Sequence, residues 1–210
     1  VDLRDPKLSI TPDGRLMIVA GGSIYNGTKT LQGRQPRVMF SKDGAQWTEP
    51  QKVLADGDWL WRVTWHDGVA YGVSYNTVDP AAKVDWSLTL YRSNDGVDWK
   101  KIKTLEVPGR ANETTLRFLQ DGRLVAMVRR EGNEAQGHQR RGWIGVSEAP
   151  YEKWSWTEIH QHFGGPNFIE LPSGVLWAGT RGPGAKTILC EMTPTSLKPV
   201  LTLPSGGDCS

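Results

Sequence analysis

The heptapeptide Ser-Lys-Asp-Gly-Ala-Gln-Trp at Ser41–Trp47 recurs as Ser-Asn-Asp-Gly-Val-Asp-Trp at Ser93–Trp99, 52 positions further along the chain. In each copy the aspartate is suited to accept backbone N–H groups of its own turn, and the glycine permits a left-handed conformation. The tryptophan is placed to pack back onto the strands that the turn joins. Two copies at this distance predict a repeated structural unit rather than an isolated turn.

A second motif keeps nearly the same period, and it consists of a short turn between two apolar segments. These turns are Asp13-Gly14, Asp67-Gly68, Asp121-Gly122 and Ser173-Gly174, and the steps between them are 54, 54 and 52 residues. Asp-Gly between apolar runs is a strong signal of a β-hairpin, because glycine adopts positive φ without a Cβ clash. The repeat therefore contains a hairpin as well as the heptapeptide turn.

Each repeat divides into four short strands. In the third repeat we predict them at residues 113–118, 124–129, 143–147 and 156–159. Repeated four-stranded units of this length are typical of propeller blades. The sequence thus predicts an all-β fold, a β-propeller of four-stranded antiparallel blades, and favours it over a β-sandwich, which rarely keeps so regular a period.

The repeats set the expected blade boundaries at residues 1–55, 56–109, 110–163 and 164–206, with residues 207–210 beginning a further blade. We expect residues 1–210 to form a single, incomplete propeller domain. In such a propeller, the start of each first strand and the end of each second strand lie on one face with the long loops. Binding sites favour loops held by a rigid scaffold, so we expect the site on that face.

Composition excludes several classes of function. The 25 basic and 23 acidic residues leave a net charge of +2, which is too balanced for a general nucleic-acid surface. No run of 18 apolar residues occurs, so we expect no membrane partner. Cys190 and Cys209 form neither a disulfide framework nor a metal-ligand pattern, and the compartment stays open, a secreted or periplasmic one included.

Polar residues recur at one phase of the repeat. Arg129 and Arg181 each lie eight positions after the first residue of their hairpin turn, and Glu113 lies eight positions before Asp121. Arg4, beside Asp5, lies nine positions before Asp13, and its counterparts in the next two blades are Asp58 and Asn112. Arginine's planar fork matches a carboxylate and stays charged, so arginines converging from several blades predict an anion site. The alternative is that these are solvated residues at strand ends.

Other charged and aromatic residues are expected near the same site. Asp58-Trp59-Leu60-Trp61-Arg62 combines charges with aromatic rings that suit sugar recognition, although tryptophans packed between blades are the simpler reading. Arg129-Arg130 and Arg140-Arg141 add positive charge near the same face. His160 and His162 form a pair without a convincing third ligand, so we predict no metal site.

These motifs together resemble the sialidase (neuraminidase) superfamily over essentially the whole chain. The heptapeptide resembles the Asp box of that superfamily, and the blade phase resembles its six-bladed propeller. Arg4-Asp5-Pro6, Glu113 through the hairpin to Arg129, and Arg181 resemble the three arginines that hold the sialic acid carboxylate and the glutamate paired with them. The resemblance implies an exo-α-sialidase-like glycoside hydrolase that needs no cofactor, in which Glu113 polarises a tyrosine nucleophile of a later blade.

The sequence departs from that superfamily at the general acid. An aspartate is expected in the long loop of the first blade, but residues 21–36 contain neither Asp nor Glu. We take Asp58 as the substitute, with Asp79 and Asp85 as alternatives. The proposed substrate contacts are Arg4, Asp5, Arg62, Asn112, Arg129 and Arg181, and the partner is a glycan. Two other functions stay open: another carbohydrate-active enzyme, meaning a hydrolase of a different sugar or a polysaccharide lyase, and a non-catalytic propeller that binds glycans or proteins.

Overall fold

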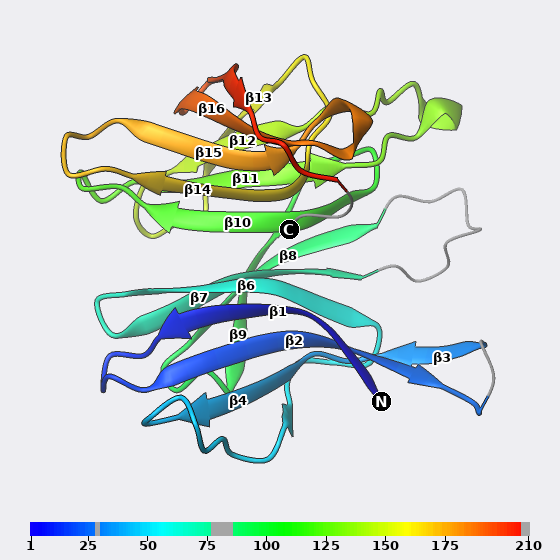
Figure 1. Cartoon of the computed structure of the whole chain (residues 1–210), viewed down its shortest axis with the longest axis vertical. Coiled ribbons are helices and arrows are strands. Elements are labelled where there is room, and N and C mark those ends of the chain that lie inside the picture. The colour runs from blue at the N-terminus through cyan, green and yellow to red at the C-terminus, as the bar shows by residue number, and fades with distance from the viewer. Residues whose placement is uncertain (28–29, 77–85, 207–210) are drawn as a thin grey trace. The chain divides into compact units, whose positions relative to one another are not determined.

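The computed structural model describes residues 1–27, 30–76 and 86–206, and it shows an all-β chain made of antiparallel blades of the β-propeller type (Figure 1). The chain divides into two compact units, Val1–Ala82 with Ser87–Leu105, and Lys83–Trp86 with Glu106–Ser210. Each unit contains two sheets, and the order of strands in each sheet follows the chain. The part of residues 207–210 that we expected to begin a further blade lies outside the described residues.

The strand bounds are as follows. The first unit holds β1 (Asp2–Ile10), β2 (Leu16–Tyr25), β3 (Leu31–Arg34), β4 (Arg37–Ser41), β5 (Gln51–Lys52), β6 (Asp58–His66), β7 (Val69–Asn76), β8 (Ser87–Ser93) and β9 (Trp99–Leu105). The second unit holds β10 (Ala111–Phe118), β11 (Leu124–Arg130), β12 (Trp143–Ser147), β13 (Trp154–Glu158), β14 (Gly164–Glu170), β15 (Leu176–Arg181), β16 (Thr187–Thr193) and β17 (Ser196–Thr202), with single 3-10 turns at Glu134–Gln136 and Pro183–Ala185. No helix in the described part of the chain is long and apolar enough to cross a membrane.

The first sheet departs from the expected four strands. Strand β2 continues to Tyr25, and β3 pairs with it inside the segment that we expected to be a loop, which gives this sheet five strands. The last strand of this sheet, β5, consists of Gln51–Lys52 alone. Pro50 precedes it and has no N–H to donate to the ladder, which explains why pairing starts only at Gln51.

The heptapeptide turns have the hydrogen bonds that the sequence predicts. Asp43 Oδ1 accepts the N–H groups of Ala45 (2.9 Å) and Gln46 (2.8 Å), and the Trp47 indole N–H donates to the Gly44 carbonyl (3.1 Å). The same bonds recur around Asp95, with the Trp99 indole donating to Gly96 at 3.0 Å. These bonds fix the turn before the last strand in the first two sheets, so the motif has a structural role there.

The hairpin turns differ in length, and this shifts one register. Asp67 and Gly68, with φ of 47° and 78°, alone connect the paired residues His66 and Val69. In the first sheet, by contrast, Ile10 pairs with Leu16, so residues 11–15 lie in the turn. The sequence analysis matched Asp58 with Arg4 by counting residues back from each turn, and the shorter turn at Asp67-Gly68 makes that match wrong by one position. Trp59, paired with Tyr75, is the register equivalent of Arg4, which is paired with Gly21.

Every first strand is interrupted by a register shift near its beginning. The shifts lie between Arg4 and Lys7, Leu60 and Val63, Ala111 and Thr114, and Gly164 and Asn167. A bulge of this kind leaves residues out of the ladder and changes the direction of their side chains. Asp5, Arg62 and Glu113 lie within three of these irregular segments, so part of the site expected from sequence falls where the first strands are least regular.

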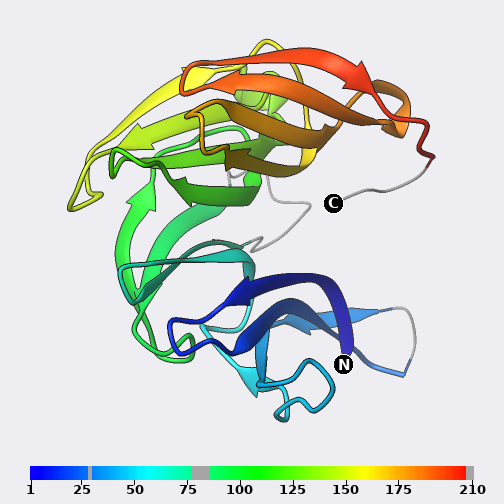
Figure 2. The same cartoon turned by 60° about the vertical axis from the view of Figure 1, so that its left-hand side comes forward.

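Each unit has its own apolar core between its two sheets. In the first unit, Met17, Val19 and Val38 pack with Leu60 and Val63 of the neighbouring sheet. In the second unit, the core joins both sheets, which face each other in Figure 2, and its largest members include Met127, Ile144, Phe163, Phe168 and Ile188. The first strands of these two sheets are also connected directly, because the Arg117 guanidinium donates to the Phe168 carbonyl at 3.0 Å.

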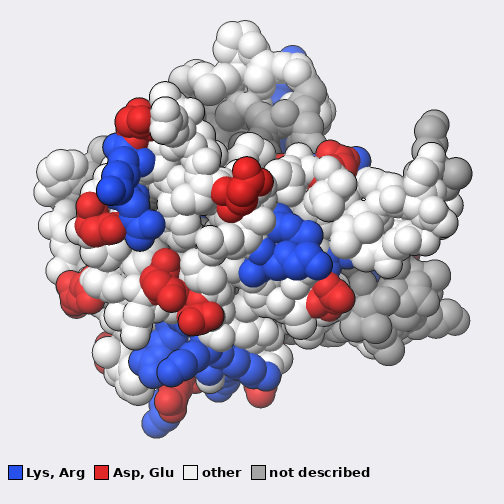
Figure 3. All heavy atoms as spheres, turned by 90° about the horizontal axis from the view of Figure 1, so that it is seen from below, with Lys and Arg blue, Asp and Glu red and all other residues white. Residues whose placement is uncertain are grey.

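Basic and acidic side chains are interspersed on the surface shown in Figure 3. This distribution matches the near-balance of charge in the sequence and offers no broad single-sign surface on that face. Cys190 is buried and unpaired within the described residues, and Cys209 lies outside them.

Candidate functional site

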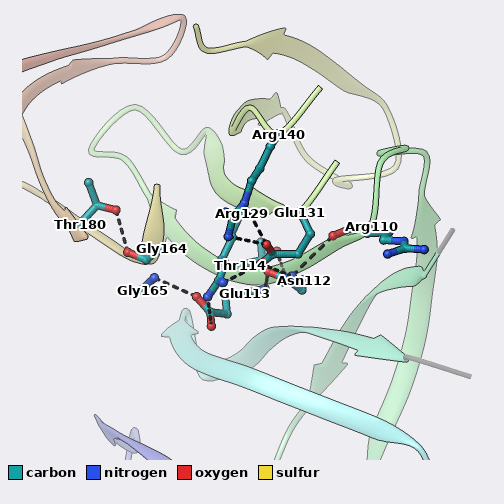
Figure 4. Close-up of polar contacts among 10 residues, drawn as sticks. All are labelled: Arg110, Asn112, Glu113, Thr114, Arg129, Glu131, Arg140, Gly164, Gly165 and Thr180. Atoms are coloured by element: carbon teal, nitrogen blue, oxygen red, sulfur yellow. Dashed lines mark hydrogen bonds and ion pairs between the residues drawn. The ribbon is translucent and has the colours of Figure 1, made fainter. Parts of the chain in front are cut away.

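A buried ion-pair cluster forms where β10 and β11 of the second unit leave the regular ladder (Figure 4). The Arg129 guanidinium bonds to Glu113 Oε1 at 2.7 Å and to Glu131 Oε1 at 2.6 Å. The side chains of Arg129 and Glu113 are each 15% exposed. The structure thus brings together Glu113 and Arg129 as the sequence predicts and adds a second carboxylate, Glu131, which in turn pairs with Arg140 at 2.8 Å.

Glu113 also connects this cluster to the neighbouring sheet. Its second oxygen, Oε2, accepts the N–H of Gly165 at 2.8 Å, and the Thr180 hydroxyl donates to the carbonyl of Gly164 at 2.8 Å. Figure 4 shows these bonds in a continuous line from Thr180 to Arg129. One carboxylate therefore fixes the position of an arginine and the start of β14 at the same time.

Asn112 supports the cluster from below the surface. It is buried, its side-chain amide donates to Glu131 Oε1 at 3.3 Å, and its Oδ1 accepts the N–H of Glu113 at 2.7 Å. The sequence nominated Asn112 as a substrate contact. The structure places it instead between the backbone at Glu113 and the carboxylate of Glu131.

Arg181 lies at the end of β15, opposite Gly164 on β14. A Cβ atom at Gly164 would lie 2.7 Å from Nη2 of Arg181, so the guanidinium lies directly against the glycine backbone. Arg181 also lines a cavity of about 480 Å³ together with Arg140, Gln161, His162 and the segment 182–185. Two arginines therefore line the same cavity: Arg140 from the β11–β12 connection and Arg181 from the end of β15.

Because the guanidinium occupies the place of a side chain at position 164, Gly164→Ala is expected to displace Arg181 without unfolding the sheet. Gly164 does not have the positive φ that strains other residues, so only the 2.7 Å contact opposes the new methyl group. We expect affinity for an acidic monosaccharide to fall by about tenfold, the loss of roughly one charge-assisted hydrogen bond.

Isothermal titration calorimetry with N-acetylneuraminic acid measures this change. Gly179→Ala on β15 is the matched control, because its Cβ would find its nearest neighbour at 3.8 Å. Equal affinity of both variants would show that Arg181 does not act from this position.

The pKa of His162 is shifted by several charged groups in and beside the cavity. Burial lowers the pKa of His162, and the positive charges of Arg140, Arg129 and Arg181 lower it further, against the opposing charge of Glu131, to about 4. One imidazole thus interacts with Arg129 and Arg181 together, the two arginines that share a phase in the sequence. His162 is consequently neutral at ordinary pH.

The pKa shifts of the ion-paired groups agree with this arrangement. Burial lowers the pKa of Arg129, but the charges and hydrogen bonds of Glu113 and Glu131 outweigh it and raise the pKa above its usual value. Burial raises the pKa of Glu131, and the charges of Arg129 and Arg140 outweigh that effect and lower it. Both groups are therefore charged at neutral pH.

The remaining site residues expected from sequence lie in the first unit. Arg4 is exposed and bonds to Asp2 at 2.6 Å, and Asp5 adopts a φ of 51° within the irregular part of β1. Asp58 is buried and accepts hydrogen bonds from the Ala55 N–H and the Ser74 hydroxyl, both at 3.1 Å, which closes the turn before β6. Arg62 is half-buried in the irregular part of β6. The convergence of Arg4 with Arg129 and Arg181 stays a prediction, and Asp79 and Asp85 lie outside the described residues.

Arg130 does not belong to the site, although the sequence suggested that the Arg129-Arg130 pair adds charge there. Alternation along β11 sends the two side chains to opposite faces. Arg130 is 1% exposed, bonds to Glu158 at 2.9 Å and lies over the Trp143 ring at 4.7 Å. It therefore stabilises the blade interior.

The ion pair between Arg130 and Glu158 is expected to make the stability of this blade sensitive to acid. Burial raises the pKa of Glu158, but hydrogen bonds from Arg130, Trp143 and Arg141 overcome this and lower it to about 2. A depressed carboxylate pKa stabilises the folded state above the unfolded pKa, and that stabilisation is lost as pH falls from about 5 toward 2. Urea denaturation followed by tryptophan fluorescence is expected to show this loss. In Glu158→Gln the slope over that range is expected to flatten, and an unchanged slope would assign the acid sensitivity to other carboxylates.

Three residues of the site were not nominated from sequence: Glu131, Arg140 as an ion-pair partner, and His162 as a cavity residue. Glu131 directly follows the two arginines that end β11, which is a signal that sequence alone could have offered. The position of His162 depends on how the β13–β14 connection folds, and no spacing rule encodes it. No cluster of three or more His, Cys, Asp or Glu residues that could hold a metal ion occurs among residues that the structure describes.

The fold is one that is also found in glycoside hydrolases of the propeller type. The structure is similar to an endo-arabinase from Bacteroides thetaiotaomicron, with a TM-score of 0.68 and 13% identity over 98% of this chain and 82% of that one. It is similar to the Hadza microbial sialidase Hz136 (TM-score 0.66, 16% identity, 90% of this chain and 44% of that one). It is also similar to a Bombyx mori GH32 β-fructofuranosidase (0.67, 14%, 94% and 48%).

These likenesses show the fold. The chain spans less than half the length of the sialidase and of the fructofuranosidase. No protein-family model matches the sequence, and no curated protein matches it significantly.

Proposed function

We propose that this protein is a sialidase-like glycoside hydrolase that acts on an acidic glycan. The observation that carries the proposal is the charge of the cavity region. Arg129, Arg140 and Arg181 all act on His162, whereas the carboxylates bonded to these arginines in the described contacts are Glu113 and Glu131. Arg140 and Arg181 line one cavity, and arginine side chains around one space suit the carboxylate of an acidic sugar.

In this proposal each residue has a separate part. Arg181 and Arg129 hold the sugar carboxylate, with Arg4 as the third proposed contact. Glu113 keeps Arg129 in place and polarises the nucleophile, as the resemblance to sialidases implies. The structural neighbours support a carbohydrate substrate, because glycoside hydrolases of several kinds share this fold. Asp58 stays the proposed acid, although its carboxylate already closes a turn.

The test is release of 4-methylumbelliferone from its N-acetylneuraminic acid glycoside by the purified chain. We expect turnover that saturates with substrate and that free N-acetylneuraminic acid inhibits. Absence of turnover together with binding of the free sugar would reduce the proposal to a glycan-binding propeller.

A second candidate is a hydrolase of a neutral sugar. It is favoured by one observation: Arg129 already bonds to two carboxylates, and Arg140 to one, so much of the positive charge is compensated within the protein. The similarity to an endo-arabinase over 82% of that chain points the same way. Release of arabinose oligomers from arabinan, with no cleavage of the sialic acid glycoside, would decide for this candidate.

A further inference from the structure

The β13–β14 connection contributes a buried polar atom that has no evident structural purpose. Nε2 of His162 is inaccessible to solvent and has no hydrogen-bond partner among the described residues. Buried polar groups are nearly always paired, and an exception calls for an explanation. His162 lines the 480 Å³ cavity with Arg140 and Arg181, two positions before Gly164.

The charged groups that act on this imidazole are Arg140, Arg129, Arg181 and Glu131. The three arginines disfavour an added proton, and the single carboxylate favours it. In the absence of a ligand, the repulsion and the burial keep the imidazole neutral. A bound anion adds a negative charge beside the imidazole, which favours its protonated form.

We propose that His162 makes anion binding in this cavity proton-linked: when the carboxylate of an acidic sugar is bound beside Arg181, the imidazole takes up one proton from solvent. The sugar carboxylate keeps its charge, and the imidazolium becomes a further positive group near it. The inference rests on the proposed acidic ligand, but it concerns binding and does not require that the glycoside be cleaved.

The expected size of the linkage follows from the two states of His162. Without ligand its pKa is about 4, and a compensating anion returns it toward the ordinary value of 6.5. Since the liganded state then binds more protons, affinity rises as pH falls. Between pH 7.5 and 5.5 the affinity is expected to increase by at most about tenfold, because burial, the largest cause of the lowered pKa, remains when the anion is bound.

Calorimetric titration of the whole chain with N-acetylneuraminic acid, and separately with D-galacturonic acid, tests the inference. Titrations at pH 5.5 and 7.5, each in two buffers of different ionisation enthalpy, count the protons taken up. We expect uptake at pH 5.5 and tighter binding there. His162→Gln keeps an uncharged polar side chain and is expected to abolish both the uptake and the pH dependence. His160→Gln, an exposed neighbour in the same connection, is the matched control and is expected to retain them.

The outcomes separate the two proposals. Uptake that persists in His162→Gln overturns the role of His162, and so does the failure of both acidic sugars to bind the wild type. Proton-linked binding without cleavage of the methylumbelliferyl glycoside supports the role of His162 and refutes the hydrolase. Cleavage without proton uptake refutes only the linkage.

Discussion

Glu113→Gln is expected to lower kcat for an acidic glycoside by about 10²- to 10³-fold. The substitution keeps the shape of the side chain but removes the charge opposite Arg129, and only one of its two terminal atoms still accepts a hydrogen bond. Both the 2.7 Å bond to Arg129 and the 2.8 Å bond from Gly165 depend on carboxylate oxygens. A change in kcat greater than that in KM would indicate that Glu113 acts during the reaction rather than in substrate binding.

The control for this variant is Glu148→Gln, which changes an exposed glutamate at the far end of β12 in the same unit. It is expected to leave both kinetic constants within twofold of the wild type. Equal activity of Glu113→Gln and Glu148→Gln would remove Glu113 from the chemistry. Circular dichroism and urea midpoints of the two variants show whether a loss of activity comes from a loss of folding.

Phe168→Ala is expected to destabilise the second unit by about 3–5 kcal/mol. Phe168 is 1% exposed and lies in the core that joins the two sheets of that unit. Removing its ring leaves a cavity that the sheet closes only in part, because the backbone of β14 is held in place by its ladder with β15. Urea denaturation monitored by tryptophan fluorescence measures the change in the free energy of unfolding.

The adjacent residue offers a matched control. Ile169 lies on the same strand but on its opposite face and is 49% exposed, so Ile169→Ala is expected to change stability by no more than about 0.5 kcal/mol. Similar losses for the two variants would contradict the assignment of the strand faces.

Most of the fold could be predicted from sequence because turns determine it. The heptapeptides and the Asp-Gly turns fix where strands end, and the strands of the third repeat were placed within two residues of their observed bounds. The errors arose where turn length or strand pairing is not encoded by composition. A two-residue turn at Asp67-Gly68 moved the phase of one strand, and β3 formed in a polar segment because β2 extended beyond its apolar part.

The candidate site was harder to predict. The shared phase of Arg129 and Arg181 and the pairing of Glu113 with Arg129 follow from hairpin register, which sequence can supply. Asn112 was nominated for a ligand but is occupied within the protein, because a bulge turns it toward Glu131. His162 depends on the folding of a connection between sheets, and its environment consists of charges from three different elements. Such an environment cannot be read from spacing.

The register shift near the start of every first strand divides that strand into parts under different structural constraints. Beyond the shift, strict alternation is needed because one side of the strand is committed to the interior. Within it, two residues per blade lie outside the ladder, and their side chains do not follow that alternation. A lineage that duplicates such blades thus inherits equivalent positions in every blade, at which new side-chain chemistry can arise at little cost to the pairing of the strands.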